Sequence, residues 1–329
     1  MTVQLSIIVT TRNRAYAVVH CLDAIAAAVA RAAPLDAEIV VVDNGSIDDT
    51  ASRLAAWAGA SAVPVRVLSE PRAGKARALN LALRTAGGEL LAFTDDDCRL
   101  HGEHINDLLR HAAGDTDLVL RGGRIKLGDQ TDRPYSIDTR PMRMRWTRTA
   151  KSPRWENVTA CILGCNMTMR RALVERLGPF DEDFGPGTSI GSGDDSEFAF
   201  RAYLSGVALE HVPDMIVFHH HGRKSSAAAR ALFRRYMIGS GALNMKFGRE
   251  YPVLWKQTYW DLKDVLKEIL STSNTLLPEI GFSHRDKLAC VLRGALRYLL
   301  VRKRRGAWTP WDEECRGALA ASAAARRAM

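Results

Sequence analysis

Short apolar segments alternate with helix-forming segments over residues 5–93, and this alternation restricts the fold more than any other feature of the chain. The apolar segments cover residues 5–10, 38–42, 65–68 and 89–93. Between them, residues 15–33, 48–58 and 73–86 are predicted to be helices. Because such alternation buries each strand between helices, it predicts an α/β fold: a mostly parallel sheet with helices on both faces.

The middle of the chain is less regular. We expect strands at residues 121–125 and 215–218 and helices at residues 171–177 and 194–204. Residues 133–153 are polar, basic and contain proline, so they predict a long loop. Residues 184–193 are rich in glycine and predict a mobile loop.

Beyond residue 225 only helix signals remain, at residues 227–247, 253–269 and 285–302. We therefore divide the chain into an α/β domain, residues 1–225, and a C-terminal helical region, residues 226–329. The last of these helices is expected to be amphipathic. Its apolar stripe would consist of Leu288, Leu292, Ala295 and Leu299, and its opposite face of Arg293, Arg297 and Arg304.

The positive charge of the chain is confined to this helical region. The formal net charge is +9, and the residues from Ala227 onward contain 19 Lys or Arg and 9 Asp or Glu. Such asymmetry indicates a nucleic-acid or membrane-surface partner. No recognised nucleic-acid-binding motif is present, so we expect an anionic membrane surface; the alternative is that the apolar stripes only pack on the α/β domain. The tryptophans that suit a membrane interface are Trp255, Trp260, Trp308 and Trp311.

The chain lacks other signals of membrane insertion or secretion. No stretch approaches ~18 consecutive apolar residues, and the N-terminus does not resemble a signal peptide. We therefore expect a cytoplasmic protein, peripheral at most on the inner face of the membrane. The six cysteines form no CxxC pair, which favours reduced, packed thiols over zinc or disulfides.

Polar side chains follow three of the predicted strands. They are Thr10, Thr11, Arg12 and Asn13, then Asp43 and Asn44, then Asp95, Asp96 and Asp97. Ligands of open parallel sheets bind beyond the carboxyl ends of the strands. Acidic and amide residues are also common in turns, so each group alone is weak evidence for a site. For Asp95-Asp96-Asp97 by itself, the alternative is helix capping together with solvated charge. Together, the crowded carboxylates would repel one another unless a divalent cation such as Mg²⁺ or Mn²⁺ neutralised them.

Three further groups are candidates for chemistry. Asp194 and Asp195 begin a helix after the Gly-rich loop, where they either stabilise the helix dipole or supply a general base. His219-His220-His221 follows a strand, so His219 and His221 are expected to point to the same side. One of these histidines contacts a metal or phosphate, or the histidines have a structural role. The predicted helix of residues 73–86 carries Lys75, Arg77 and Asn80. These side chains either form a solvated helix face or contact the diphosphate and sugar of a ligand.

Several well-known nucleotide and hydrolase motifs are absent. The chain has no GxxxxGK[ST] loop, no GxGxxG after the first strand and no GxSxG. An ATP-binding P-loop, a Rossmann dinucleotide site and an α/β-hydrolase nucleophile are therefore not supported.

In combination, these segments resemble glycosyltransferase family 2, the bacterial nucleotide-sugar glycosyltransferases with the GT-A fold. The similarity covers about two-thirds of the chain, and seven pieces occur in the family's order. In sequence order they are SIIVTTRNR at 6–14, VVDNGS at 41–46 with DDT at 48–50, GKARALN at 74–80, FTDDD at 93–97, GCNM at 164–167 with RR at 170–171, GPFDE at 178–182, and GDDSE at 193–197 with Arg201.

The resemblance implies a role for individual residues. Asp43 would bind the nucleotide base, commonly uracil. Asp95-Asp96-Asp97 would be the DxD motif, with Asp97 a metal ligand and Asp95 near the ribose or metal. Asp195 would be the catalytic base, although Asp194 stands where the family usually has Glu. A late His contacts the metal or diphosphate, with His219 slightly preferred over His221. The other residues expected around the nucleotide-sugar are Thr10, Thr11, Arg12, Asn13, Asn44, Lys75, Arg77, Asp96, Asn166 and Asp194.

The resemblance therefore implies a Rossmann-related GT-A fold and an inverting, metal-dependent glycosyltransferase. The expected cofactor is Mn²⁺ or Mg²⁺, and the expected donor is a nucleotide-sugar, most simply a UDP-sugar. The acceptor would be a glycan or a lipid-linked glycan in cell-surface polysaccharide synthesis. Two other functions are a sugar nucleotidyltransferase and a non-enzymatic nucleic-acid-binding protein. A sugar nucleotidyltransferase usually has a Gly-rich loop after the first strand, whereas the segment TTRNRAY contains no glycine. A nucleic-acid-binding protein is disfavoured because the excess of positive charge is absent from the first 226 residues.

Overall fold

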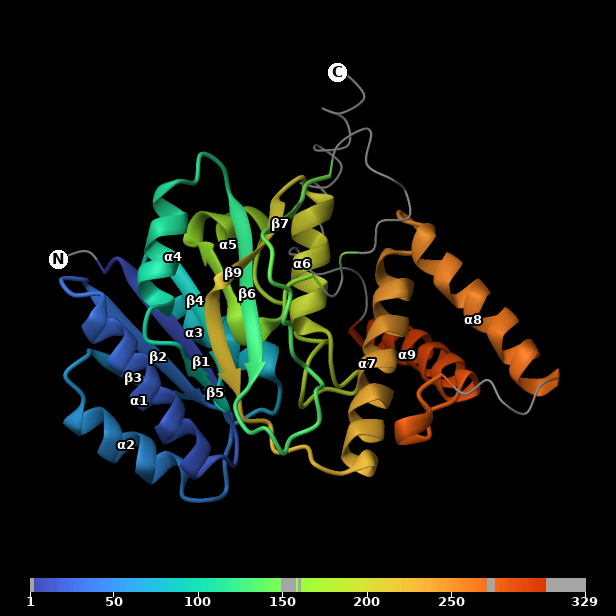
Figure 1. Ribbon diagram of the computed structural model, residues 1–329, viewed down its shortest axis with the longest axis horizontal. Helices are drawn as coiled ribbons and strands as arrows, with labels where there is room; N and C mark the ends of the chain where they lie inside the picture. Colours follow the sequence, from blue (N-terminus) through green and yellow to red (C-terminus); the bar gives the residue numbers. More distant parts are fainter. Residues whose placement is uncertain (1–2, 149–157, 159–160, 271–275, 306–329) are drawn as a thin grey trace.

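The computed structural model describes residues 3–148, 158, 161–270 and 276–305 (Figure 1). Within these ranges, nine strands form one mixed sheet of order β3-β2-β1-β4-β8-β6-β9-β5, with β7 paired to β9. The strands are β1 Leu5–Thr11, β2 Ala37–Asp43, β3 Val65–Ser69, β4 Leu90–Asp95, β5 Cys98–Leu100, β6 Val119–Leu127, β7 Met144–Trp146, β8 Met167–Arg170 and β9 Ala208–His219. The predicted Trp308 and Trp311 lie outside the described residues.

The first four strands run parallel, and β1, β2 and most of β4 are buried on both faces, as the alternation predicts, whereas the edge strand β3 is partly exposed. Ile7 of β1 lies opposite Ile39 of β2 and Ala92 of β4. Successive side chains of a strand point to opposite faces. Ile8 and Val40 accordingly belong to one buried cluster, and Ile7 and Ile39 to the other. Burial on both faces explains why these strands are continuous apolar runs rather than alternating ones.

Two sets of helices form the outer layers. One face is covered by α1 Ala15–Arg31, α2 Thr50–Ala60 and α4 His104–Ala113. The other is covered by α3 Lys75–Thr85, α5 Arg171–Leu177 and α6 Asp194–Leu204, joined by part of α7 Ser226–Phe247. The short helix η1 Gly164–Asn166 precedes β8. The predicted α/β fold with a mostly parallel sheet is confirmed.

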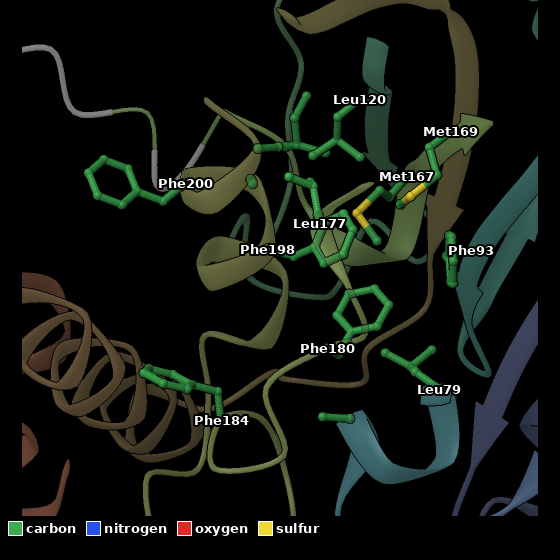
Figure 2. Close-up of a cluster of buried hydrophobic side chains, with 14 of the residues drawn as sticks. Leu79, Phe93, Leu120, Met167, Met169, Leu177, Phe180, Phe184, Phe198 and Phe200 are labelled. Carbon is green, nitrogen blue, oxygen red and sulfur yellow. The ribbon is translucent and has the colours of Figure 1, made fainter. Parts of the chain in front are cut away.

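Aromatic side chains fill the second of these layers. Figure 2 shows Phe180 between Phe93 of β4 and Phe198 of α6. The ring centroids of Phe180 lie 5.7 Å from Phe93 and 4.6 Å from Phe198. Asn80 holds Phe180 in place, because its amide donates to the Phe180 carbonyl and accepts from the Phe180 N–H. Asn80 therefore has a structural role in the fold.

The middle of the chain contains more strand than predicted. β9 runs from Ala208 to His219 rather than over residues 215–218, because it continues through a bulge opposite Gly123/Arg124 that contains Pro213. A bulge leaves residues unpaired, which allows a proline inside a strand. β7 lies within the segment predicted as a loop, and the three-residue β5 was not predicted.

The predicted C-terminal helices are present as α7, α8 Val253–Leu270 and α9 His284–Arg305, with the short helix η2 Pro278–Ile280. In Figure 1, α7 stands between the sheet and α9, and α8 is outermost. Of the stripe predicted for the last helix, Ala295 is buried, together with Val291 and Tyr298, whereas Leu292 and Leu299 are exposed. No helix among the described residues is long and apolar enough to cross a bilayer.

Helix α7 is tied to the α/β core by a buried lysine. Lys246 Nζ lies 2.6 Å from Asp181 Oδ2 and 2.7 Å from Glu197 Oε1. Burial raises the pKa of Asp181, but the charge of Lys246 outweighs it and lowers the pKa to about 2. The lower folded-state pKa means that this stabilisation is present above pH 3.8 and is lost as pH falls toward 2. The division of the chain at residue 225 remains a prediction, while α7 itself packs into the core of the α/β domain.

We expect Lys246→Met to destabilise the protein by about 3–5 kcal/mol, because it leaves the buried Asp181 carboxylate without its paired cation, whereas Glu197 keeps its pair with Arg201. Urea unfolding of the variant should show a lower midpoint at an unchanged slope. The control is Lys267→Met, which removes an exposed pair with Asp264 and should cost at most about 1 kcal/mol. Equal midpoints for the two variants would contradict a stabilising role of the Lys246 pairs.

Candidate active site

A pocket of about 390 Å³ opens at the carboxyl ends of β1 and β4. Three segments far apart in the sequence meet there: the acidic turn after β4, the start of α6 and the end of β9. This is the position expected for a ligand site in an open α/β sheet. Among the predicted site residues, its lining includes Thr10, Thr11, Arg12, Asn44, Lys75, Asp95, Asp96, Asp97, Asp194, Asp195 and His219.

The three acidic residues after β4 have different partners. Lys75 Nζ lies 2.5 Å from Asp95 Oδ1. Asp96 accepts a hydrogen bond from Thr11 Oγ1, and burial raises the pKa of Asp96 to about 6. Asp97 lies 2.9 Å from Arg14 Nη1 and 3.2 Å from His219 Nε2. The motif is therefore a set of three differently held carboxylates rather than a helix cap.

His219 reaches Asp97 because of strand pairing. In the antiparallel β5–β9 pair, Cys98 lies opposite His219, which places Asp97 beside the imidazole. Burial raises the pKa of Asp97, but the hydrogen bond and charge of His219 outweigh it and hold the pKa below its usual range. Burial lowers the pKa of His219, but the hydrogen bond with Asp97 outweighs it and raises the pKa to about 9. In the absence of a cation, Asp97 and His219 thus form an ion pair.

The structure separates the two candidate histidines. Their rings lie 5.0 Å apart, so both point to the same side as predicted. His219 lines the pocket, whereas His221 Nε2 faces the Arg133 carbonyl and its Nδ1 lies 3.5 Å from Asp132. His221 is therefore held away from the acidic turn.

The start of α6 supplies two further carboxylates. Asp195 Oδ2 accepts from the Gly164 N–H at 2.9 Å, and Oδ1 accepts from the Ser196 N–H at 2.7 Å. Burial raises the pKa of Asp194 to about 6 despite the opposing charge of Lys75. A carboxylate has about four lone-pair sites, so Asp195 keeps acceptor capacity toward the pocket.

The Gly-rich loop before α6 forms one wall of the pocket. The Pro186 carbonyl accepts from the Lys75 N–H at 2.9 Å, and a Cβ at Gly187 would lie 2.7 Å from the Gly74 nitrogen. The loop is also joined to the helical region, since Ser192 Oγ donates to the Arg235 carbonyl and Arg297 donates to the Ser189 carbonyl. The loop predicted as mobile is thus held against both α3 and the C-terminal helices.

Four of the predicted binding residues lie outside the pocket lining. Asn13 accepts from the Ile47 N–H and Asp43 accepts from the Ser46 N–H, so both organise the turn after β2. Arg77 pairs with Glu182 at 3.3 Å. Asn166 is buried, with its amide bonded to His104 and to the carbonyls of Arg124 and Met215. The Asn166 amide is thus committed to the fold, which explains its position without a donor.

Residues that the prediction missed also line the pocket. Arg14 joins it through Asp97, and the helical region contributes Leu232, Arg235 and Tyr236 from α7. Arg223, just after β9, lines it too, and its buried Nη1 has no hydrogen-bond partner among the described residues. Leu232, Arg235 and Tyr236 gave no signal in the sequence, because their position depends on where α7 crosses the sheet edge, whereas Arg14 is the last residue of the motif at 6–14.

Two thiols lie behind the acidic turn. Cys98 and Cys165 are buried, and their sulfur atoms and a His219 ring nitrogen lie within 4.8 Å of one another. Burial raises the pKa of Cys98 well above its usual range. The described cysteines are free thiols, packed as predicted.

Comparison with known proteins identifies the family. Residues 6–178 match the family model described as glycosyl transferase family 2. The chain belongs to glycosyl transferase family 2. It is 25% identical to glycosyltransferase AglE of Haloferax volcanii over 245 residues, which cover 73% of each chain.

Solved structures share the fold of this family 2 glycosyltransferase. The mannosyltransferase PcManGT from Pyrobaculum calidifontis, in complex with GDP-Man and Mn²⁺, has a TM-score of 0.58 at 22% identity, covering 99% of this chain and 88% of that one. S. aureus TarS 1–349 in complex with UDP has a TM-score of 0.52 at 17% identity, covering 91% and 92%. The GT-A fold and transferase activity expected from the sequence are therefore confirmed for this glycosyltransferase.

Proposed function

We propose that the chain is an inverting, divalent-cation-dependent glycosyltransferase. It would move a sugar from a nucleotide-sugar donor, most simply a UDP-sugar, to a hydroxyl group of a glycan or a lipid-linked acceptor. The observation that carries the proposal is the convergence of Asp95, Asp97, His219 and Asp195 on one pocket at the sheet edge. The product would enter cell-surface polysaccharide or glycolipid synthesis at the cytoplasmic face of a membrane.

Donor binding would use the strand ends. Asp43 would hold the nucleotide base. The neighbouring Asn44 is fixed by hydrogen bonds of its side-chain amide to the backbone of Glu70, Arg72 and Gly74. Lys75 and Arg223 would face the diphosphate, because both line the pocket beside the acidic turn. The neighbours support a nucleotide ligand here, since one is bound to GDP-Man and another to UDP.

The acidic turn fits a hard divalent cation. Asp95 and Asp97 offer carboxylate oxygens and His219 offers Nε2, a ligand set compatible with Mn²⁺ or Mg²⁺. Their present partners, Lys75 and Arg14, are cations, so both carboxylates already lie against positive charge, which supports a cation at this position. When bound, such an ion would neutralise the charge that develops on the leaving diphosphate.

Transfer would then depend on residues of this chain. The acceptor oxygen forms a bond to the anomeric carbon as the bond to the diphosphate oxygen breaks. Asp195 accepts the proton of that hydroxyl from the opposite side, which gives inversion. The backbone N–H groups of Gly164 and Ser196 fix the orientation of its carboxylate. Lys75 would remain near the leaving group, and the wall of the pocket formed by the loop of residues 185–193 would help to exclude water.

A thermal-shift screen of nucleotides and their sugars, with and without Mn²⁺ or Mg²⁺, tests the proposal. A ligand at 100 times its dissociation constant stabilises the folded state by ~2.7 kcal/mol. We expect stabilisation by UDP and UDP-sugars that requires the cation. Stabilisation by GDP-sugars alone would show that the donor nucleotide is GDP rather than UDP. The absence of a response to any nucleoside diphosphate would contradict the proposal.

A further inference from the structure

We infer that the α8–α9 face, defined below, is the surface by which the enzyme binds an anionic membrane. On α8 the face consists of Tyr259, Trp260, Leu262, Leu266, Ile269 and Leu270; on α9 it consists of Leu292, Leu296, Leu299 and Leu300. These ten residues are 45–87% exposed. The two helices contact each other, and a large exposed apolar patch on a monomeric protein indicates an interaction site.

The face is fixed in orientation by the packing of α9 on α7. A Cβ at Gly241 would lie 1.9 Å from the Val291 carbonyl oxygen, and one at Gly294 would lie 1.9 Å from that of Ile238. The two helices thus approach closely through glycine, with Ala295 and Tyr298 buried beside the contact. The exposed leucines of α9 lie on a different side of the helix from the residues that contact α7. Because that contact fixes the rotation of the helix, these leucines cannot turn toward the core.

Helix α8 has little other packing to explain its composition. Among its described residues only Leu254 and Asp261 are buried. Tyr259, Leu262, Leu266, Ile269 and Leu270 recur at spacings of three or four, the period of one helix face. In Figure 1, α8 lies on the outside of the molecule, beyond α7 and α9 from the sheet.

The charges on these helices favour a lipid surface over a second copy of the chain. The two helices carry eleven Lys or Arg and four Asp or Glu residues. All four acids are already paired with bases: Asp261 with Lys287, Asp264 with Lys267, Glu268 with Arg285, and Asp286 with Arg230 and Arg234. Two such positive faces would repel each other, whereas anionic headgroups would attract one.

The details of α8 fit an interface of this kind. Lys263 Nζ lies 4.8 Å from the centroid of Tyr259 and 4.7 Å from that of Trp260. Lysine stems can cover apolar surface while the ammonium group stays at headgroup level, and Tyr and Trp are enriched at that level. An amphipathic helix with these features lies in the plane of the interface.

The face is also connected to the active site. Arg297 of α9 donates to the Ser189 carbonyl, in the loop that forms one wall of the pocket. Membrane binding through α8 and α9 would therefore place the pocket near the bilayer, where a lipid-linked acceptor is found. Only the use of membrane binding, access to a lipid-linked acceptor, rests on the proposed function. Membrane binding itself can be measured without donor or acceptor.

The test is sedimentation of the full chain with vesicles of phosphatidylglycerol or of phosphatidylcholine. We expect the protein to pellet with the anionic vesicles at low salt and less at 1 M salt, where the screening length falls to ~3 Å. Replacing Leu262 and Leu266, or Leu292 and Leu296, with serine should weaken partition by about tenfold for each leucine. The Arg293→Glu and Lys303→Glu variants should each weaken binding to anionic vesicles by at least about fivefold.

Ile47→Ser is the matched control, because Ile47 is 93% exposed and directly precedes α2, which lies on the side of the molecule opposite α8 in Figure 1. It should bind vesicles like the unchanged chain, and thermal melting should show every variant folded. Failure of the full chain to pellet with anionic vesicles would overturn the inference, and is the result expected if residues 306–329 cover the face. A dimer in light scattering that both leucine pairs disrupt would overturn it in favour of a second copy.

Discussion

Asp195→Asn is expected to lower the rate of sugar transfer by roughly 10²–10⁴-fold while donor affinity is retained. The exchange keeps the shape of the side chain and removes its ability to take a proton. Asp195 lines the pocket, and its carboxylate is oriented by two backbone N–H groups. Single-turnover rates and calorimetric titration of the nucleoside diphosphate would separate the two effects.

The hydrogen bonds of Asp195 make a stability check necessary. An asparagine oxygen can replace only one of the two carboxylate oxygens, so either the Gly164 or the Ser196 N–H loses an acceptor. Thermal melting therefore has to accompany the rate measurement. A folded variant with a rate near that of the unchanged enzyme would exclude Asp195 as the base.

Asp194→Asn is the matched control. Asp194 is adjacent, buried and lines the same pocket, and burial raises its pKa to about 6, a value that also suits a general base. Because its charge lies near Lys75, we expect its loss to weaken donor binding more than the chemical step. A larger loss of rate for Asp194→Asn than for Asp195→Asn, at equal stability, would transfer the role of base to Asp194.

The parallel part of the sheet was predictable because its strands, except the edge strand β3, are buried on both faces. Such strands appear in the sequence as apolar runs, and their carboxyl ends meet at one edge. Asp95 and Asp97 could therefore be placed at that edge before the structure was known, whereas Lys75 was assigned to the same site only through the family resemblance. Their alternative as a helix cap was excluded only when their separate partners became visible.

The rest of the site depends on pairings that leave no local signal. His219 meets Asp97 through the three-residue strand β5, and β9 contains a proline at its bulge. Asn166 and Asn80 belong to the family's motifs, yet their amides bond to backbone and hold strands and turns. On α9 two apolar stripes share the helical period, so the spacing alone could not distinguish the buried one from the exposed one.

Asp97→Asn is expected to abolish cation-dependent nucleotide binding, with a loss of affinity of at least about 100-fold. Altering a residue that only supports a metal ligand costs about 10–100-fold, and Asp97 is proposed to be a ligand itself. Without the cation, the carboxylates at the sheet edge would repel a diphosphate. Calorimetry with UDP, with Mn²⁺ and after EDTA treatment, measures this directly.

Asp214→Asn is a control with the same local chemistry. Asp214 pairs with Arg110 at 2.6 Å and His111 at 2.9 Å, as Asp97 pairs with Arg14 and His219, but it lies outside the pocket lining. The control should bind Mn²⁺ and UDP normally, which would show that the effect of Asp97→Asn is not the loss of an Arg–Asp–His cluster as such. If UDP binds the untreated and EDTA-treated enzyme equally, or binds Asp97→Asn as tightly as the unchanged chain, the acidic turn does not hold a cation and the affinity for diphosphate comes from Lys75, Arg14 and Arg223 alone.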